Sequence, residues 1–291
     1  MSDPKLEYPA LYTSADDASA RAQSGFLWTI RAEYCLLLLV SLSLANKDVF
    51  KHSRLAVTLL LVILAGLFVF KVVKKLDQDW YRCRALAESV KTLTWRFCMR
   101  AHPFVDAEKI AVPKAAFRNQ LRGILQSNQA IAQELITPES EQVTASMLEI
   151  RAFGLPERIA YYIANRVDDQ RRWYARKSVW NRRMLRVWVV ITILIYLAAA
   201  LSLYADELGY GWLSRFFDPL IVLVTSVLGW IQMKRHSELT ASYNLAAHEI
   251  GIIKGNAEAV KTEDEFSDFV NEAELAFSRE HTQWVARKDA T

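Results

Sequence analysis

One stretch of the chain combines side chains that could bind a nucleotide. Its aromatic and charged residues recur at helical spacing: Trp80, Tyr81, Arg84, Glu88, Lys91, Trp95 and Arg96. Aromatic rings stack on bases, and guanidinium and ammonium groups pair with phosphates. The stretch therefore suggests a ligand-binding site. The competing interpretation is a packing seam beside a solvated basic face, which would equally suit anionic lipid headgroups.

The signatures of catalysis and metal binding are missing from the sequence. No phosphate-binding GxxxxGK[ST] loop and no GxGxxG turn occurs. Glu249 follows His248, but Ile252 stands where the zinc-protease motif needs its second histidine. The 5 histidines are scattered, and the 3 cysteines form no CxxC pair. We therefore expect a protein that is not an enzyme and that uses no metal or cofactor.

Four apolar windows without charged residues predict the helices that position this stretch. They run from Tyr34 to Asn46, Leu55 to Phe70, Val187 to Ala205 and Pro219 to Met233. A membrane-spanning helix needs roughly 20 apolar residues, and flanking Arg and Lys side chains can extend the shorter windows by snorkelling. Tryptophans near the window ends are typical of membrane interfaces. Four transmembrane helices are expected, and the alternative is buried helices of a soluble bundle.

The windows continue into long polar helices. We expect Leu55 to Phe104 to form one helix of about 48 residues, roughly 70 Å long, and the chain after Pro156 to form another of about 50 residues. The fourth window should likewise continue into a polar helix. We call each of these polar helical extensions a stalk. On the first stalk, apolar positions alternate in steps of four and three: Leu76, Trp80, Cys83, Ala87, Val90, Thr94 and Phe97. We expect this seam to pack against residues 15–31.

Helix-capping signals mark three expected starts. Ser14 with Asp17 and Thr262 with Glu265 have the spacing of capping pairs, and Thr137 precedes Pro138 at a first helical position. The middle of the chain should be helical and interrupted at Pro113. The chain is thus divided into a first hairpin unit with its stalk (1–104), a helical connector (105–155), and a second hairpin unit with a stalk and C-terminal amphipathic helix (156–291).

The fold class expected is all-α: a polytopic membrane protein with four transmembrane helices in two hairpins and long cytoplasmic stalks, an internal duplication in outline. Basic residues gather after the second window and before the third, whereas the loop between the third and fourth carries only Arg215. By the positive-inside rule, both termini and the stalks are cytoplasmic.

Polar side chains within the windows could line a pore in an oligomer: Thr58, Ser202, Thr225, Ser226 and Gln232. The alternative is that the hydroxyls bond their own backbone or pack between helices. No window contains an ionisable Asp, Glu, Lys, Arg or His residue, which disfavours an ion-coupled transporter.

Four segments together resemble the SLATT family of membrane proteins, over nearly the whole chain as two units in tandem. They are YPALYTSADDASARAQ, WYRCRALAESVKTLTWRFCMRAHPF, DDQRRWYARKSVWNRRM and EFSDFVNEAELAFSREHTQWVAR. The resemblance implies a prokaryotic protein of the inner membrane. It also implies a pore-forming effector of a defence system, since family members are proposed to breach the membrane, some of them alongside cyclases that make nucleotide messengers.

The hypothesis from the sequence is therefore a homo-oligomeric pore in the lipid bilayer, opened by a cyclic oligonucleotide or a protein signal that the cytoplasmic helices bind. The alternative is a non-conducting membrane scaffold whose cytoplasmic helices dock a soluble partner. No nucleic-acid polymer is expected as a partner.

Overall fold

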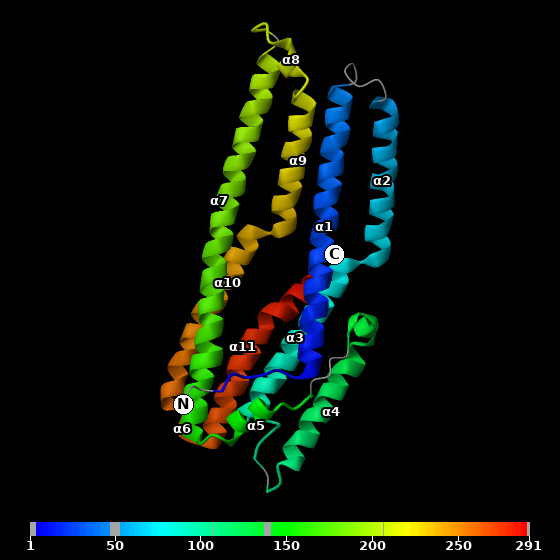
Figure 1. Cartoon of the computed structure of the whole chain (residues 1–291). Coiled ribbons are helices and arrows are strands. Elements are labelled where there is room, and N and C mark those ends of the chain that lie inside the picture. Colours follow the sequence, from blue (N-terminus) through cyan, green and yellow to red (C-terminus); the bar gives the residue numbers. More distant parts are fainter. Residues whose placement is uncertain (1–3, 47–52, 107, 137–140, 206, 290–291) are drawn as a thin grey trace. The chain divides into compact units, whose positions relative to one another are not determined.

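In a computed structural model the described part of the chain is mostly helical (Figure 1). The described residues are 4–46, 53–106, 108–136, 141–205 and 207–289, with side chains as far as Ser278. No strand occurs in these ranges. The elements in chain order are α1 (Ala10–Ala45), α2 (Ser53–Lys74), α3 (Leu76–Cys98), α4 (Ala111–Ser127), the 3₁₀ helix η1 (Gln129–Glu134), α5 (Ala145–Ala152), α6 (Leu155–Tyr162), the π-helix η2 (Ile163–Val167), α7 (Asp168–Tyr204), α8 (Gly211–Ser214), α9 (Phe217–Lys234), α10 (His236–Asn256), the 3₁₀ helix η3 (Ala257–Ala259) and α11 (Glu263–Asp289).

The chain forms two compact units, each assembled from distant segments. Unit 1 contains Met1–Gln23, Asp77–Lys177 and Ser242–Thr291, and unit 2 contains Ser24–Leu76 and Ser178–Ala241. The apolar windows fall in unit 2 and the charged helices in unit 1. Hydrophobicity, rather than order along the chain, therefore decides which segments pack together.

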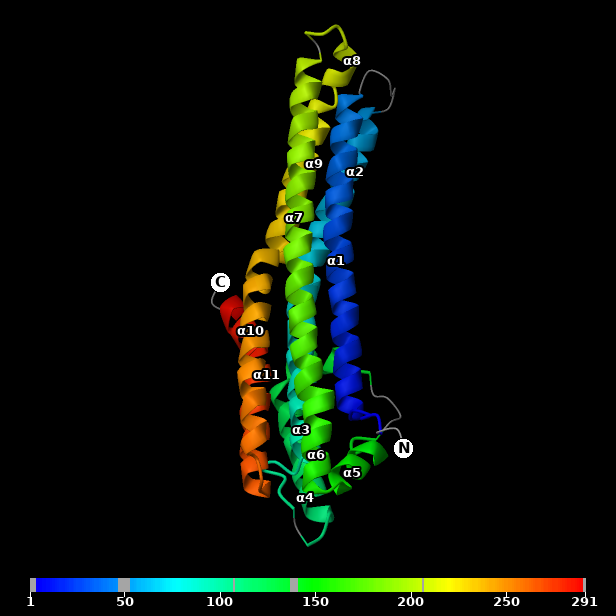
Figure 2. The ribbon, with the colours of Figure 1, turned by 90° about the vertical axis from the view of Figure 1, so that its left-hand side faces the viewer.

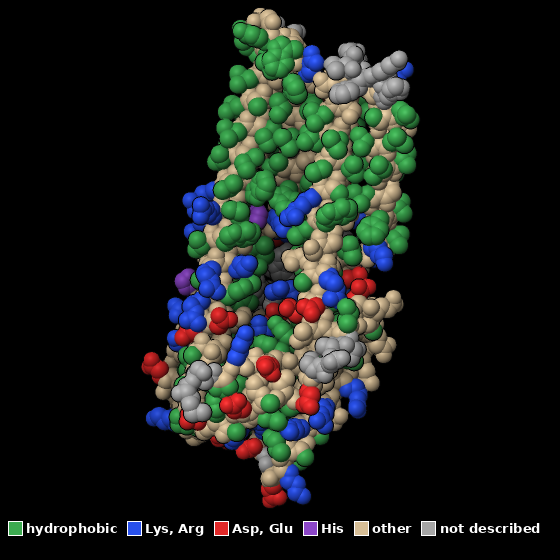
Figure 3. All heavy atoms as spheres, in the orientation of Figure 1, with side chains coloured by type: hydrophobic (Ala, Val, Ile, Leu, Met, Phe, Trp, Pro, Cys, Tyr) green, Lys and Arg blue, Asp and Glu red, His purple; other side chains and the backbone are tan. Residues whose placement is uncertain are grey.

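Unit 2 presents an apolar surface. In α2 none of the residues is buried, and large side chains such as Leu59, Val62 and Val69 are more than half exposed. Figure 3 shows hydrophobic side chains over α2, α9 and the upper half of α7, whereas Lys and Arg side chains gather along the lower half of α7. So large an exposed apolar area is unfavourable in water and is expected in lipid.

The structure has four helices that are long and apolar enough to cross a membrane, one for each predicted window. The expected all-α fold with four such helices is confirmed, whereas their pairing into hairpins stays a prediction. Within unit 2, Lys71 of α2 forms an ion pair with Glu33 of α1 at 2.7 Å. The rings of Trp188 on α7 and Trp230 on α9 pack edge to face at 6.3 Å.

Unit 1 is built around α3. The predicted seam is buried from Cys83 to Phe97, and residues Leu11, Ala15 and Ala18 of α1 belong to the same core. The Ser19 hydroxyl of α1 donates to the backbone carbonyl of Trp80 at 3.3 Å. The expected packing of the seam on the first helix is therefore confirmed for the start of α1.

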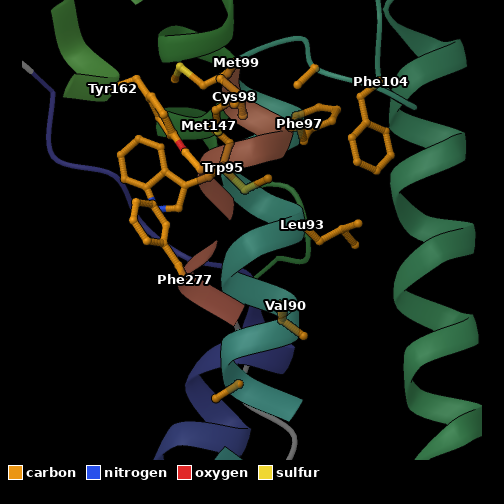
Figure 4. Close-up of a cluster of buried hydrophobic side chains, with 14 of the residues drawn as sticks. Val90, Leu93, Trp95, Phe97, Cys98, Met99, Phe104, Met147, Tyr162 and Phe277 are labelled. Carbon is orange, nitrogen blue, oxygen red and sulfur yellow. The ribbon is translucent and has the colours of Figure 1, made fainter. Parts of the chain in front are cut away.

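Aromatic rings fill the core on both sides of α3. Trp95 lies with Tyr162 and Phe277 on one side, and Phe97 lies with Phe104 toward α4 on the other (Figure 4). Phe117 of α4 packs on Phe97 with ring centroids 4.9 Å apart. The connector residues are thus part of the unit 1 core.

Two buried arginines close the C-terminal end of α3, where helical carbonyls lack intrahelical partners. Arg151 donates from Nη1 to the carbonyl of Phe97, and Arg158 donates to that of Met99 at 2.9 Å. Arg158 also forms an ion pair with Glu263. Positive charge at a helix C-terminus is stabilised by the helix dipole, so these arginines fix the end of α3.

The prediction of one uninterrupted helix from Leu55 to Phe104 is wrong. The chain leaves helical geometry at Lys75, which has a φ of 45°, so α2 and α3 are separate and α3 ends at Cys98. Arg235 separates α9 from α10 in the same way, with a φ of 48°. Each residue closes the preceding helix, because the N–H of Lys75 donates to Lys71 and that of Arg235 to Ile231.

The other long helix is confirmed, since a continuous helical run of 50 residues extends from Leu155 to Tyr204, with one π turn at η2. The Thr262 cap is also confirmed: its hydroxyl accepts from the N–H of Glu265 at 3.3 Å, and that carboxylate accepts from the N–H of Thr262 at 3.0 Å.

Two smaller predictions fail. The Ser14 start is wrong, because α1 already begins at Ala10, directly after Pro9. Pro113 does not interrupt the helix there, since it lies in the first turn of α4, where a missing N–H costs no hydrogen bond. Thr137 and Pro138 lie outside the described residues.

The break at Lys75 can be tested by a β-branched residue, which the left-handed region disfavours strongly. We expect Lys75→Ile to lower the stability of the full-length protein by about 1–2 kcal/mol, measured as thermal unfolding in detergent. The control is Lys74→Ile, which places the same side chain in helical geometry one residue earlier. Equal unfolding temperatures for the two variants would contradict a required break.

Candidate functional site

The seven residues predicted to bind a ligand all lie on α3 in unit 1, but they divide into two environments. Trp80 and Tyr81 are half-buried and stack on each other, with centroids 4.6 Å apart and ring planes 21° apart. Trp95 is only 2% exposed and donates from Nε1 to the Tyr8 hydroxyl at 3.0 Å. Its ring therefore supports the core and offers no open face for stacking.

Two cations of the set, Arg84 and Lys91, meet around the carboxylate of Glu88. Glu88 lies 3.7 Å from Arg84 Nη2 and 3.9 Å from Lys91 Nζ. Burial lowers the pKa of Lys91, and the nearby positive charge of Arg166 acts in the same direction, whereas Glu88 partly opposes them. A titratable side chain whose pKa is shifted by burial and by specific charged neighbours marks a candidate functional site.

Below this face lies a buried ion pair that the sequence analysis missed. Arg166 is 2% exposed and Glu274 of α11 is 0% exposed. The guanidinium donates from Nε to one carboxylate oxygen at 2.8 Å and from Nη2 to the other at 2.7 Å. Burial alone would lower the pKa of Arg166, but the Glu274 carboxylate raises it well above its ordinary value.

Two neutral donors complete the shell of Glu274. The hydroxyls of Thr92 on α3 and Tyr162 on α6 each donate to it at 2.9 Å. The Arg166 guanidinium also lies over the Phe277 ring, 4.8 Å from its centroid. In both ribbon views α3, α6 and α11 run close together in unit 1, as these bonds require (Figures 1 and 2).

A π-helical turn positions Arg166. The residue lies within η2, where the hydrogen-bond register widens by one residue between α6 and α7. Such turns are frequent at functional sites because they rotate a side chain out of the regular helical pattern. Here the side chain within the π turn is the arginine that pairs with Glu274.

Two tyrosines at the chain's start cover this region. The rings of Tyr8 and Tyr12 lie 4.4 Å apart, and burial raises the pKa of Tyr12 to about 12, with the charges of Asp16 and Glu88 adding to the effect. Burial also raises the pKa of Tyr8. Both phenols therefore remain neutral hydrogen-bonding groups at physiological pH.

We call these groups the charged cluster: Arg84, Glu88, Lys91, Arg96, Arg166 and Glu274. Cations outnumber carboxylates in it, and the nearby Asp16 is exposed. Within the described part of the chain, Arg96 Nε and Arg166 Nη1 are buried donors without a hydrogen-bond partner. The cluster is thus short of acceptors, which is the electrostatic condition for binding an anion.

The predicted pore-lining residues use their side chains locally in this single chain. The hydroxyls of Thr58, Ser202, Thr225 and Ser226 each donate to a carbonyl three or four residues earlier in their own helix. Thr58, Thr225 and Gln232 are exposed, and the two serines are buried. A role in lining a pore stays a prediction. The described residues include no group of three or more His, Cys, Asp or Glu able to hold a metal ion.

The structural weight of the ion pair can be measured directly. Glu274→Ala leaves Arg166 buried without its counter-charge, so we expect a loss of about 3–5 kcal/mol in stability, followed as thermal unfolding in detergent. Glu272→Ala is the matched control, since Glu272 is exposed on the same helix and should change stability by less than about 0.5 kcal/mol. Similar losses in both variants would show that the pair does not hold unit 1 together.

Comparison with known families accounts for nearly the whole chain. Residues 9–159 match the SMODS and SLOG-associating 2TM effector domain 3, and residues 162–284 match the SMODS and SLOG-associating 2TM effector domain 1. No curated protein and no solved structure matches the chain. Each matched region contains two of the four apolar helices, α1 and α2 in the first and α7 and α9 in the second. The protein therefore belongs to the SLATT family and consists of two SLATT domains in tandem.

Proposed function

We propose that this membrane effector permeabilises the bilayer when an anionic signal binds the charged cluster of unit 1. The observation that carries the proposal is the coincidence of each 2TM effector domain with one pair of apolar helices. Effector domains act on a target, and here the apolar helices make the membrane itself the candidate target. The defence setting that the family description implies supports a lethal or growth-arresting outcome.

The electrostatics of the charged cluster support an anionic signal. Lys91 has a lowered pKa, and two buried guanidinium donors have no partner in the described residues. A nucleotide second messenger would supply phosphate oxygens for these donors, and charge-assisted hydrogen bonds of this kind are strong. Trp80 and Tyr81 are half-buried on the same helix and offer an aromatic surface for stacking with a base.

Two helices provide a route from the cluster to the membrane. In α1 and in α7 the helix is unbroken, and each contributes residues to both units. By contrast, α2 and α3 are separated at Lys75, and α9 and α10 at Arg235. A displacement around Arg166, which directly precedes α7, is therefore expected to reach the membrane chiefly through α7 and α1.

The path for ions or solutes would require several copies. A homo-oligomer could bring together the polar positions Thr58, Ser202, Thr225, Ser226 and Gln232. The hydroxyls of the four Ser and Thr residues would then exchange their local backbone bonds for water. The proposal puts both termini on the cytoplasmic side of the inner membrane, and the distribution of Lys and Arg supports this orientation.

A non-conducting scaffold is the second candidate, favoured by one observation. Leu245 and Ile252 on α10 are 71% and 73% exposed, and their seven-residue spacing puts both on one face of the helix. An exposed apolar face of this kind can dock a partner protein.

Proteoliposomes distinguish these candidates. Full-length protein in vesicles loaded with a self-quenched dye should release it when cyclic oligonucleotides are added, and empty vesicles should not. If no ligand causes dye release, at protein densities that give oligomers by crosslinking, the pore is rejected and the scaffold is favoured.

A substitution at Lys91 tests signal binding separately from stability. Because its charge is partly desolvated, Lys91→Met should leave the unfolding temperature unchanged or raise it. The same variant should shift the ligand concentration for half-maximal release upward by about tenfold, since one charge-assisted contact is lost. Lys109→Met, an exposed lysine outside the cluster, is the control. An unchanged response in Lys91→Met would remove the lysine from the signal site.

A further inference from the structure

Two cations in unit 2 converge on one aromatic ring. The guanidinium carbon of Arg31, on α1, lies 5.4 Å from the ring centroid of Trp230, on α9. The ammonium group of Lys234, one turn further along α9, lies 4.9 Å from the same centroid. Both distances fall within the range of cation–π attraction, so the ring holds two positive charges close together.

The surroundings of Trp230 fix this geometry. Trp188 of α7 packs against its edge. The preceding residue is Gly229, and a Cβ atom built there would lie only 2.6 Å from the hydroxyl oxygen of Tyr34. Only glycine lets α1 approach α9 so closely at this point, and this approach brings Arg31, one turn before Tyr34, over the tryptophan.

No carboxylate among the described residues neutralises the two cations. The nearest acids along the chain are already paired: Glu33 with Lys71 at 2.7 Å, and Glu238 with Arg235 at 3.0 Å. Arg31 and Lys234 therefore repel each other across the ring. Two like charges held together on a fixed support are stabilised by an anion that contacts both.

The location indicates where that anion comes from. Arg31 lies just before the apolar part of α1, Trp188 lies at the start of the apolar part of α7, and Lys234 ends α9. The three helices meet here through Tyr34, Gly229, Trp188 and Trp230, so the site lies at one end of the apolar region. Lipid phosphates occupy this depth of a bilayer, where Trp, Arg and Lys side chains are favoured.

We propose that Arg31, Trp230 and Lys234 form a binding site for the phosphate of an anionic phospholipid headgroup. The guanidinium and the ammonium group donate to the phosphate oxygens, and the tryptophan ring supports both cations from below. Bound lipid would also hold α1 against α9. This inference does not depend on whether the protein forms a pore.

Native mass spectrometry of the full-length protein in detergent tests the site. The protein is titrated with phosphatidylglycerol or with phosphatidylcholine, and the fraction carrying bound lipid is measured. We compare the wild type with Arg31→Gln/Lys234→Gln and with the control Arg182→Gln/Arg183→Gln. The control removes the same charge from exposed arginines of α7 that have no ring or carboxylate contact in the described residues.

The site predicts that the Arg31/Lys234 variant loses about tenfold in affinity for phosphatidylglycerol while the control retains it. Wild-type protein should also prefer phosphatidylglycerol over phosphatidylcholine. Equal losses in both double variants would overturn the proposal, because general surface charge would then explain binding. The variant Arg31→Lys/Lys234→Arg keeps both charges and should retain most of the affinity. That result would show that the loss in Arg31→Gln/Lys234→Gln comes from the missing charges and not from misfolding.

A separate arm distinguishes a lipid from a soluble phosphate. Millimolar inorganic phosphate is added to the wild-type protein with phosphatidylglycerol bound. Retention of the lipid supports a site for a lipid headgroup. Full displacement of the lipid would overturn that assignment and indicate a site for free phosphate instead.

Discussion

The organisation of unit 1 depends on one buried ion pair, Arg166 with Glu274. Removing two charges from water costs several kcal/mol, and the cost is offset only when geometry and accessory hydrogen bonds are good. Both conditions hold here, since the carboxylate accepts from Arg166 twice and from Thr92 and Tyr162 once each. The pair and its two hydroxyl donors join α3, α6, η2 and α11, and so any group that competes for either partner changes the packing of four elements.

The rest of the fold divides into segments suited to lipid and segments suited to water. Apolar helices gather in unit 2, where α2 buries none of its residues, and charged helices gather in unit 1 around an aromatic core. The chain passes between the units within α1 and α7, but it breaks helical geometry at Lys75 and Arg235. These breaks exclude the single continuous helix from Leu55 to Phe104 that the sequence predicts. They leave α1 and α7 as the continuous connections, and Arg166 lies at the entrance to the second.

The sequence predicts features that depend on local pattern. Apolar windows, the seam from Cys83 to Phe97 and the Thr262 capping box follow from spacing, and the structure has them. The breaks at Lys75 and Arg235 were missed because a left-handed lysine or arginine costs only about 1–2 kcal/mol and has no sequence signature comparable to glycine. The sequence suggests Trp95 as a ligand-binding residue because no local pattern shows that its hydrogen-bond partner is Tyr8, which lies 87 residues away. Glu274 could have been noticed, because it lies on the apolar face of α11 that also carries Val270 and Phe277.

Under the proposed function, the ion pair is both a structural lock and the contact that the signal disturbs. The most direct test is the conductance of planar bilayers containing the Glu274→Gln variant, with no activating ligand present. This change keeps the side chain's shape and removes its charge. The account predicts conductance close to that of activated wild-type protein, because Arg166 loses its partner without any signal. A folded, membrane-inserted variant that remains silent would contradict the claim that the pair holds the protein closed.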